Sequence, residues 1–79
     1  MALQIDWENW DPTTPLTMPL SSSAISSIYY DPITWTLTIT FTDGTDYDYD
    51  GVPLSVVIGL VEAPSAGYFF NKMIRGIYD

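Results

Sequence analysis

Four residues near the C-terminus, Ser65, Gly67, Asn71 and Arg75, form a candidate anion site. Asn71 and Arg75 are four residues apart, so they share a helix face if a helix extends that far. Ser65 and Gly67 would lie at the start of that helix, where free backbone N–H groups and the helix dipole favour a phosphate or carboxylate. A structural role competes with this hypothesis, with Ser65 as a cap, Asn71 bonded to loop carbonyls and Arg75 paired with an acid. We favour the structural role, because every helix start needs its N–H groups satisfied.

A second group, Asp46, Asp48 and Asp50 followed by Gly51, matches the opening of a calcium-binding EF-hand loop. The closing glutamate is missing, because the last position of such a loop would be Val57. Alternate residues of a strand lie roughly 7 Å apart, which is too far for one shared ion. We therefore expect a solvated acidic sheet face, without a metal ion or other cofactor.

Catalytic residue types are scarce in this chain. The sequence has no histidine and no cysteine, so it lacks the commonest general base and the most reactive nucleophile. Lys72 is the only lysine that could serve as an amine base. We do not expect an enzyme.

Charge narrows the choice of partner. Ten acidic residues stand against two basic ones, which gives a net charge of −8. Both basic residues, Lys72 and Arg75, lie near the C-terminus. Such a surface repels phosphate backbones, so nucleic acid is an unfavourable partner and a basic protein surface is a permitted one. No apolar stretch is long enough to span a bilayer, so we expect no membrane association.

The pattern of the chain predicts an α+β fold in two parts. Residues 1–23, rich in Pro, Thr and Ser, read as an extended arm, and residues 24–79 as one small domain. A three-stranded antiparallel meander is expected at 24–30, 34–42 and 45–50. Pro53 fits the start of one helix, Ala63-Pro64 its end, and Ser65 the cap of a second. Two short C-terminal helices packed on one sheet face would complete the domain.

The hairpin register follows from desolvation. A two-residue turn would pair Phe41 with Asp46 and place carboxylates on the apolar face, at a prohibitive cost. A three-residue loop, Thr42-Asp43-Gly44, avoids this and needs Gly44 at positive φ. It predicts one buried face made by the following residues: Trp35, Leu37, Ile39, Phe41, Tyr47 and Tyr49.

The arm carries four apolar anchors: Leu3, Ile5, Trp7 and Trp10. A short arm has no core of its own to bury indole rings. It either folds back on its own domain or inserts these side chains into a neighbouring chain, as aromatic residues do at interface hot spots. We expect the second arrangement, in which the arm makes most of the partner contact.

Residues 22–78 resemble the KTSC domain, a short module named for a C-terminal region of lysyl-tRNA synthetases. The likeness runs through Ser22-Ser23-Ala24-Ile25, Tyr30-Asp31-Pro32, Leu37-Thr38-Ile39-Thr40-Phe41, Tyr47-Asp48-Tyr49, Val52-Pro53, the stretch from Ala63 to Asn71, and Ile74-Arg75-Gly76-Ile77-Tyr78. The resemblance implies a fold and attaches no activity. KTSC domains also occur alone in small bacterial and phage proteins, and the resemblance implies that this chain is such a protein. Many members of the family have a more basic surface, and this sequence differs from them at Asp46, Asp48 and Asp50.

Two function hypotheses remain. The first is a non-enzymatic interaction module, a phage virion structural or accessory protein of the capsid or tail that docks through its arm. Its partners would be other virion subunits or a second copy of itself, and its location the virion or the host cytoplasm. The alternative is a soluble regulator, either a small-anion or nucleotide-binding module or an acidic inhibitor of a host enzyme.

Overall fold

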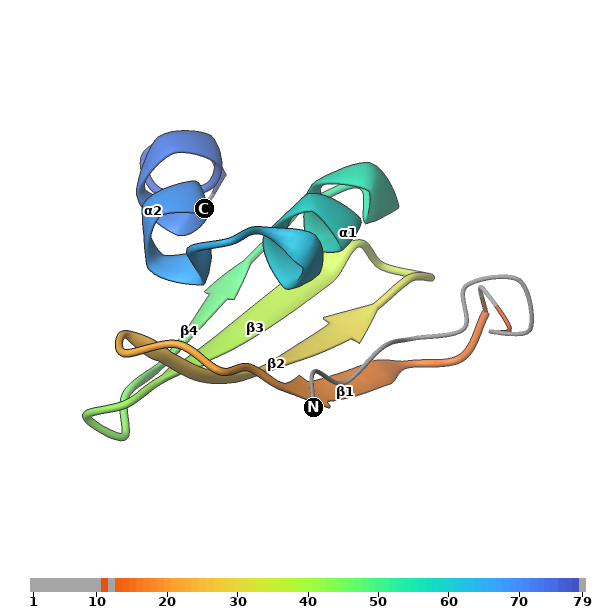
Figure 1. Cartoon of the computed structure of the whole chain (residues 1–79). Coiled ribbons are helices and arrows are strands. Elements are labelled where there is room, and N and C mark those ends of the chain that lie inside the picture. Colours follow the sequence, from red (N-terminus) through yellow and green to blue (C-terminus); the bar gives the residue numbers. More distant parts are fainter. Residues whose placement is uncertain (1–10, 12, 79) are drawn as a thin grey trace.

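The computed structural model describes Asp11 and residues 13–78. In this part of the chain the elements follow the order β1 (Leu16–Pro19), β2 (Ile25–Asp31), β3 (Thr36–Phe41), β4 (Asp46–Tyr49), α1 (Leu54–Glu62) and α2 (Ala66–Met73). The strands form one antiparallel sheet in the order β1-β2-β3-β4. Both helices cover the same face of that sheet (Figure 1). The predicted α+β class with two C-terminal helices is therefore confirmed.

The sheet has one strand more than the sequence predicted. Leu16–Pro19, which we expected in the extended arm, forms β1 and pairs with β2. Leu16 and Met18 alternate into the core with exposed fractions of 9% and 6%. The prediction of three strands was wrong because the proline-rich residues 1–23 were interpreted as an extended arm without a strand of the sheet. An edge strand tolerates proline at its end, since only one of its sides has to form ladder hydrogen bonds.

The β3–β4 hairpin has the register expected from the position of its carboxylates. Ile39 pairs with Tyr47 and Leu37 with Tyr49. The backbone N–H of Phe41 donates to the carbonyl oxygen of Thr45 over 2.8 Å. Gly44 has a φ of 93°, as the three-residue loop requires.

Part of the predicted buried face is exposed. Leu37 and Ile39 are completely buried, but Trp35 is 50% exposed and Tyr47 56% exposed. Trp35 belongs to the preceding turn, with a φ of 59°, and its carbonyl oxygen accepts a hydrogen bond from the Val52 N–H. The prediction was wrong for Trp35 because the alternating pattern continues through a turn residue. Tyr47 lies on the edge strand β4, where cover is incomplete.

The core lies between the sheet and the two helices. Its completely or almost completely buried side chains are Ile25, Ile28, Tyr30, Leu37, Ile39, Val52, Val57, Leu60 and Ile74. They come from β2, β3, the loop before α1, α1 itself and the C-cap of α2, so both the sheet and the helical layer contribute. Burial on this scale is the main driving force for a chain of this size.

The helix boundaries follow local signals. Ser65 is the N-cap of α2, and its Oγ accepts a hydrogen bond from the Tyr68 N–H. Pro53, which we expected at the first helical position of α1, is instead its N-cap, and the helix begins at Leu54. Gly59 allows the helices to pack closely, because a Cβ there would lie 2.7 Å from the Phe69 ring. None of the helices in the described residues is long and apolar enough to cross a membrane.

Candidate binding groove

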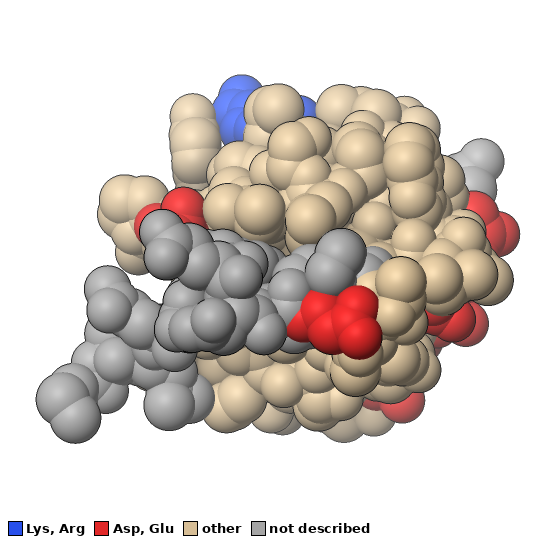
Figure 2. All heavy atoms as spheres, turned by 90° about the vertical axis from the view of Figure 1, so that its right-hand side faces the viewer, with Lys and Arg blue, Asp and Glu red and all other residues tan. Residues whose placement is uncertain are grey.

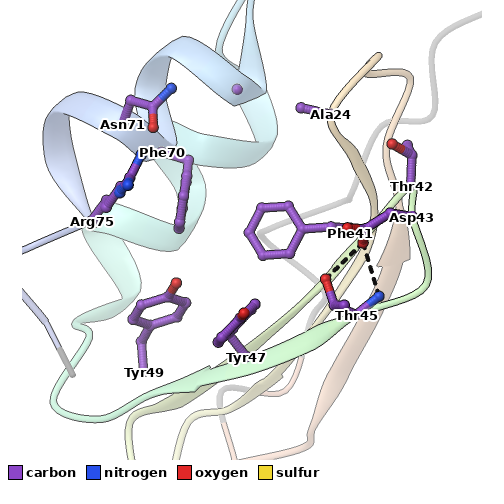
Figure 3. Close-up of a pocket in the computed structure, with 11 residues that line it drawn as sticks. Ala24, Phe41, Thr42, Asp43, Thr45, Tyr47, Tyr49, Phe70, Asn71 and Arg75 are labelled. Atoms are coloured by element: carbon purple, nitrogen blue, oxygen red, sulfur yellow. Dashed lines mark hydrogen bonds between the residues drawn. The ribbon is translucent and has the colours of Figure 1, made fainter.

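A groove of about 610 Å³ opens between the β3–β4 hairpin and α2. Figure 3 shows its walls, with the hairpin on one side and α2 on the other. Residues from both elements, together with Ala24 just before β2, line it: Ala24, Phe41, Thr42, Asp43, Thr45, Tyr47, Tyr49, Gly67, Phe70, Asn71 and Arg75. Elements far apart in the sequence therefore build this surface together.

Four aromatic side chains form the apolar part of the groove. Phe70 of α2 packs edge-to-face on Phe41, with ring centroids 5.3 Å apart, and on Tyr49, at 5.6 Å. Phe41 also packs edge-to-face on Tyr47, at 5.8 Å. Tyr47 and Tyr49 point to the helix side because they alternate along β4 with the aspartates. The contacts hold the hairpin and α2 in a fixed relation.

Polar groups border the aromatic rings. Asn71 and Arg75 are exposed and line the groove on the α2 side (Figure 3). Arg75 lies beyond the end of α2, since the helix stops at Met73. Its backbone N–H nevertheless donates to the carbonyl oxygen of Phe70 over 2.9 Å, which keeps it beside the groove.

The four predicted anion-site residues are only partly brought together. Gly67, Asn71 and Arg75 line the groove, whereas Ser65 does not. The Ser65 hydroxyl caps α2 by accepting from the Tyr68 N–H over 3.3 Å. A Cβ at Gly67 would lie 3.3 Å from the Ala24 Cβ, so this glycine allows close packing beside the groove.

Two groove groups have shifted protonation equilibria. The Asp43 carboxylate accepts hydrogen bonds from the Thr45 hydroxyl, at 2.6 Å, and from the Thr45 N–H, at 3.0 Å. These bonds lower the pKa of Asp43, so it stays ionised at neutral pH. Burial raises the pKa of Tyr49, which the charge of Tyr47 raises further and that of Arg75 lowers. Tyr49 is therefore a protonated hydrogen-bond donor at neutral pH.

The opposite sheet face is acidic and threonine-rich. Thr38 donates its hydroxyl proton to Asp48 over 2.7 Å, and Thr36 donates to Asp50 over 3.4 Å. Asp46 stands opposite Thr40 in the register. Within the described residues there is no group of three or more His, Cys, Asp or Glu side chains placed to hold a metal ion.

The two cations lie together at one end of the domain. Figure 2 shows the basic side chains at the top of the molecule and the visible carboxylates lower down. The Lys72 ammonium lies 5.8 Å from the centroid of the Tyr68 ring. Of these two side chains, Arg75 lines the groove and Lys72 does not.

The structure tests some sequence-based site assignments and not others. The four anchors predicted for partner binding, Leu3, Ile5, Trp7 and Trp10, lie outside the described residues. The aromatic groove was missed as a site, because three of its four rings, Phe41, Tyr47 and Tyr49, were assigned to the buried face of the hairpin. The alternation of Tyr47 and Tyr49 on an edge strand, where cover is incomplete, was the available signal.

Comparison with known proteins places the chain in one family. The KTSC domain model matches residues 21–78. A KTSC domain protein from Yersinia pestis has a crystal structure that superposes with a TM-score of 0.78 at 38% identity, over 84% of this chain and 93% of that one. The fold therefore matches an experimentally determined member.

Curated relatives are of two kinds. A lysine–tRNA ligase of a Nostoc species is 45% identical over 62 residues, which cover 78% of this chain but only 11% of the ligase. An uncharacterized protein of Stutzerimonas stutzeri is 41% identical over 56 residues, which cover 71% of this chain and 79% of that protein. The chain thus spans about a tenth of the ligase and most of the smaller protein. Together with the family match, these relationships establish that the chain belongs to the KTSC domain family.

Proposed function

We propose that this chain is a non-enzymatic protein-interaction module that holds its partner in the groove between the β3–β4 hairpin and α2. The observation that carries the proposal is the open groove with four aromatic side chains and a neighbouring guanidinium. Tyr and Arg are enriched among the residues that contribute most binding energy at protein interfaces, and Phe is enriched in the cores of such interfaces. Tyr47, at 56% exposed, has a large apolar surface still available to a partner.

The charge distribution favours a protein over a nucleic acid. A strand of nucleic acid presents one phosphate per nucleotide. The affinity of a protein for nucleic acid depends on several Lys or Arg side chains that neutralise these phosphates. The groove offers one cation, Arg75, within a chain of net charge −8. A protein segment can match both the aromatic surface and the acidic surroundings.

The chemistry of the groove supports binding without catalysis. Its carboxylate, Asp43, has a lowered pKa and stays ionised, so it is a poor general acid at neutral pH. Tyr49 has a raised pKa and is a poor base or nucleophile. The sequence supplies no histidine or cysteine to complement them.

Site-specific photo-crosslinking in the native host tests the proposal. A photoreactive benzophenone amino acid replaces Tyr47 in one variant and Tyr29 in a control. Tyr29 is also exposed, at 42%, but lies on β2 beside the buried Tyr30 and points to the opposite sheet face.

We expect a discrete protein adduct from position 47, identified by mass spectrometry, and none from position 29. A nuclease-sensitive adduct, equal adducts from both positions, or no adduct from position 47 would each contradict the proposal.

The more specific virion role, with docking through the arm, stays a prediction. Its anchors Leu3, Ile5, Trp7 and Trp10 lie outside the described residues. The crosslinking experiment bears on the virion role as well, because the identity of the captured protein shows whether the partner is an assembly subunit.

A further inference from the structure

Strand β4 ends the sheet beside the groove. In the described residues the sheet order is β1-β2-β3-β4, with no strand beyond β4. Asp46, Tyr47 and Asp48 are all exposed. An edge strand of this kind offers unpaired backbone groups to another extended chain.

The register identifies which backbone groups are available. Residues facing each other in an antiparallel pair alternate between hydrogen-bonded and non-bonded pairs. The Phe41 N–H donates to the Thr45 carbonyl oxygen, so the next bonded pairs are Ile39 with Tyr47 and Leu37 with Tyr49. The backbone N–H and C=O groups of Asp46 and Asp48 therefore point outward, away from β3.

The two faces beside this edge differ in chemistry. On the helix side lie Tyr47 and Tyr49, with Arg75 across the groove. On the other side lie Asp46 and Asp48, next to threonines. A strand added to β4 would place alternate side chains on these two surfaces.

A second copy of the chain is a poor occupant. Antiparallel pairing of two β4 strands would bring Asp46 and Asp48 of one copy opposite the same carboxylates of the other. Like charges directly opposite each other destabilise a strand pair. The edge thus disfavours self-pairing while leaving its backbone groups available to a strand of opposite charge.

We infer that β4 binds an extended segment of another protein in which basic residues alternate with apolar or aromatic ones. The Lys or Arg side chains lie against Asp46 and Asp48, and the apolar side chains enter the groove against Tyr47 and Tyr49. Arg75 reinforces the orientation, because a basic side chain on the groove face would meet its guanidinium. The inference rests on the proposed function and adds to it the class of segment and the way it binds.

A titration of the isotope-labelled full chain with a short synthetic peptide tests the inference. In the peptide, Lys alternates with Val and Tyr. Two controls share its length: one has the same composition with the lysines in a block, and one has Glu in place of Lys.

We expect the alternating peptide to shift the backbone amide signals of Asp46 and Asp48 and to slow their hydrogen exchange. Each control peptide should bind about ten-fold more weakly, as expected when side-chain contacts and charge pairs worth roughly 1.4 kcal/mol in total are lost. Equal binding of the block peptide, or binding without any effect on these two amides, would overturn the inference.

N-methylation of the peptide tests the hydrogen bonds without altering the protein. Methyl groups on the peptide amides that face β4 should weaken binding roughly ten- to hundred-fold, because about two ladder bonds are lost. Methyl groups on the intervening amides should change it little. Equal effects of the two methylation patterns would overturn the inference.

A protein variant gives an independent check. Asp48→Pro removes an outward N–H and leaves the β3–β4 ladder its own bonds, since proline is tolerated on edge strands in this orientation. It should abolish peptide binding, whereas Asp48→Asn should weaken it only a few-fold. If Asp48→Pro does not fold, the methylated peptides still decide the question.

The outcomes separate the inference from the proposed function. A protein adduct at position 47, together with no binding of the alternating peptide, would overturn the inference and leave the interaction role standing. The absence of any protein adduct at that position would overturn the interaction role itself.

Discussion

The hydroxyl of Tyr30 donates a 2.7 Å hydrogen bond to the backbone carbonyl oxygen of Val52, and both residues are completely buried. The bond joins the middle of the sheet to the loop from which α1 starts. No buried side-chain nitrogen or oxygen in the described part of the chain lacks a hydrogen-bond partner. Tyr30 thus brings the bulk of an aromatic ring into the core and satisfies a carbonyl that would otherwise be unpaired.

Tyr30→Phe should destabilise the protein by about 1–3 kcal/mol, because the Val52 carbonyl is left buried without a partner. For a domain of this size each kcal/mol lowers the melting temperature by about 4–8 °C. Thermal unfolding followed by circular dichroism measures the change. Tyr29→Phe is the matched control, since Tyr29 is exposed, and it should melt like the parent chain. Equal melting temperatures for the two variants would contradict this role of Tyr30.

Alkaline pH should destabilise the fold through the same residue. Burial raises the pKa of Tyr30, and the neighbouring Asp31 carboxylate adds to the effect. The unfolded chain therefore ionises first, near its ordinary pKa of about 10. The stabilisation is complete below that pH and is lost as pH rises through the folded-state pKa.

Urea unfolding at increasing pH measures this loss, and Tyr30→Phe should show a shallower decline. Tyr49 has a pKa shifted in the same direction and is present in both chains, so the difference between them isolates Tyr30. Parallel pH profiles would contradict the assignment.

Ser65→Ala should lower the free energy of unfolding by about 0.5–2 kcal/mol, since it removes the side-chain acceptor for the Tyr68 N–H at the start of α2. Ser55 in α1 is exposed and caps no helix, which makes Ser55→Ala a suitable control. Alanine has the higher helix propensity, so this control should lose no stability. Chemical denaturation of both variants measures the difference, and equal losses would argue against the cap.

Arg75→Ala should raise the pKa of Tyr49 further, because the guanidinium charge is the influence that lowers it. Titration of the Tyr49 ring signals by NMR reports the shift. Lys72→Ala also removes one positive charge, but the Lys72 ammonium lies near the ring of Tyr68. The control should therefore leave Tyr49 unchanged. The same response in both variants would show that Arg75 has no specific relation to Tyr49.

Truncation separates the arm from the sheet. Deleting residues 1–20 removes β1 with the buried Leu16 and Met18, and losing even one such side chain typically costs about 2–5 kcal/mol. This truncated chain should be largely unfolded by circular dichroism. Deleting residues 1–10 removes none of the buried residues described here, and the product should fold. A folded chain after the longer deletion would show that β1 is dispensable. The shorter deletion is the one suited to testing the predicted role of the arm in assembly.

The sequence was informative where local chemistry left one solution. Only one hairpin register keeps Asp46 and Asp48 out of the core, so both the register and the positive φ of Gly44 could be predicted. Ser65 was likewise identified as a cap, because a hydroxyl before an amphipathic run has few other roles.

Longer-range features escaped the sequence analysis. Leu16 and Met18 are apolar at alternate positions, but Pro15 and Pro19 on either side indicated an extended arm and concealed the edge strand. The groove depends on the packing of Phe70 against the hairpin, which no local pattern encodes. Asn71 and Arg75 were identified as a pair, whereas the aromatic surface between them and β4 was not.

The unbroken strand order has a consequence for how the domain folds. Each strand pairs with its neighbour in sequence, so the loops that connect the strands are short. The entropy cost of closing each loop is therefore small. All four strands are available once residue 49 has left the ribosome, before α1 or α2 exists. The apolar sheet face that includes Ile28, Leu37 and Ile39 is then exposed to solvent, because the helices that bury it are still missing. Synthesis of the C-terminal helices ends this exposure, and a chain halted before α1 would have a sheet prone to aggregate.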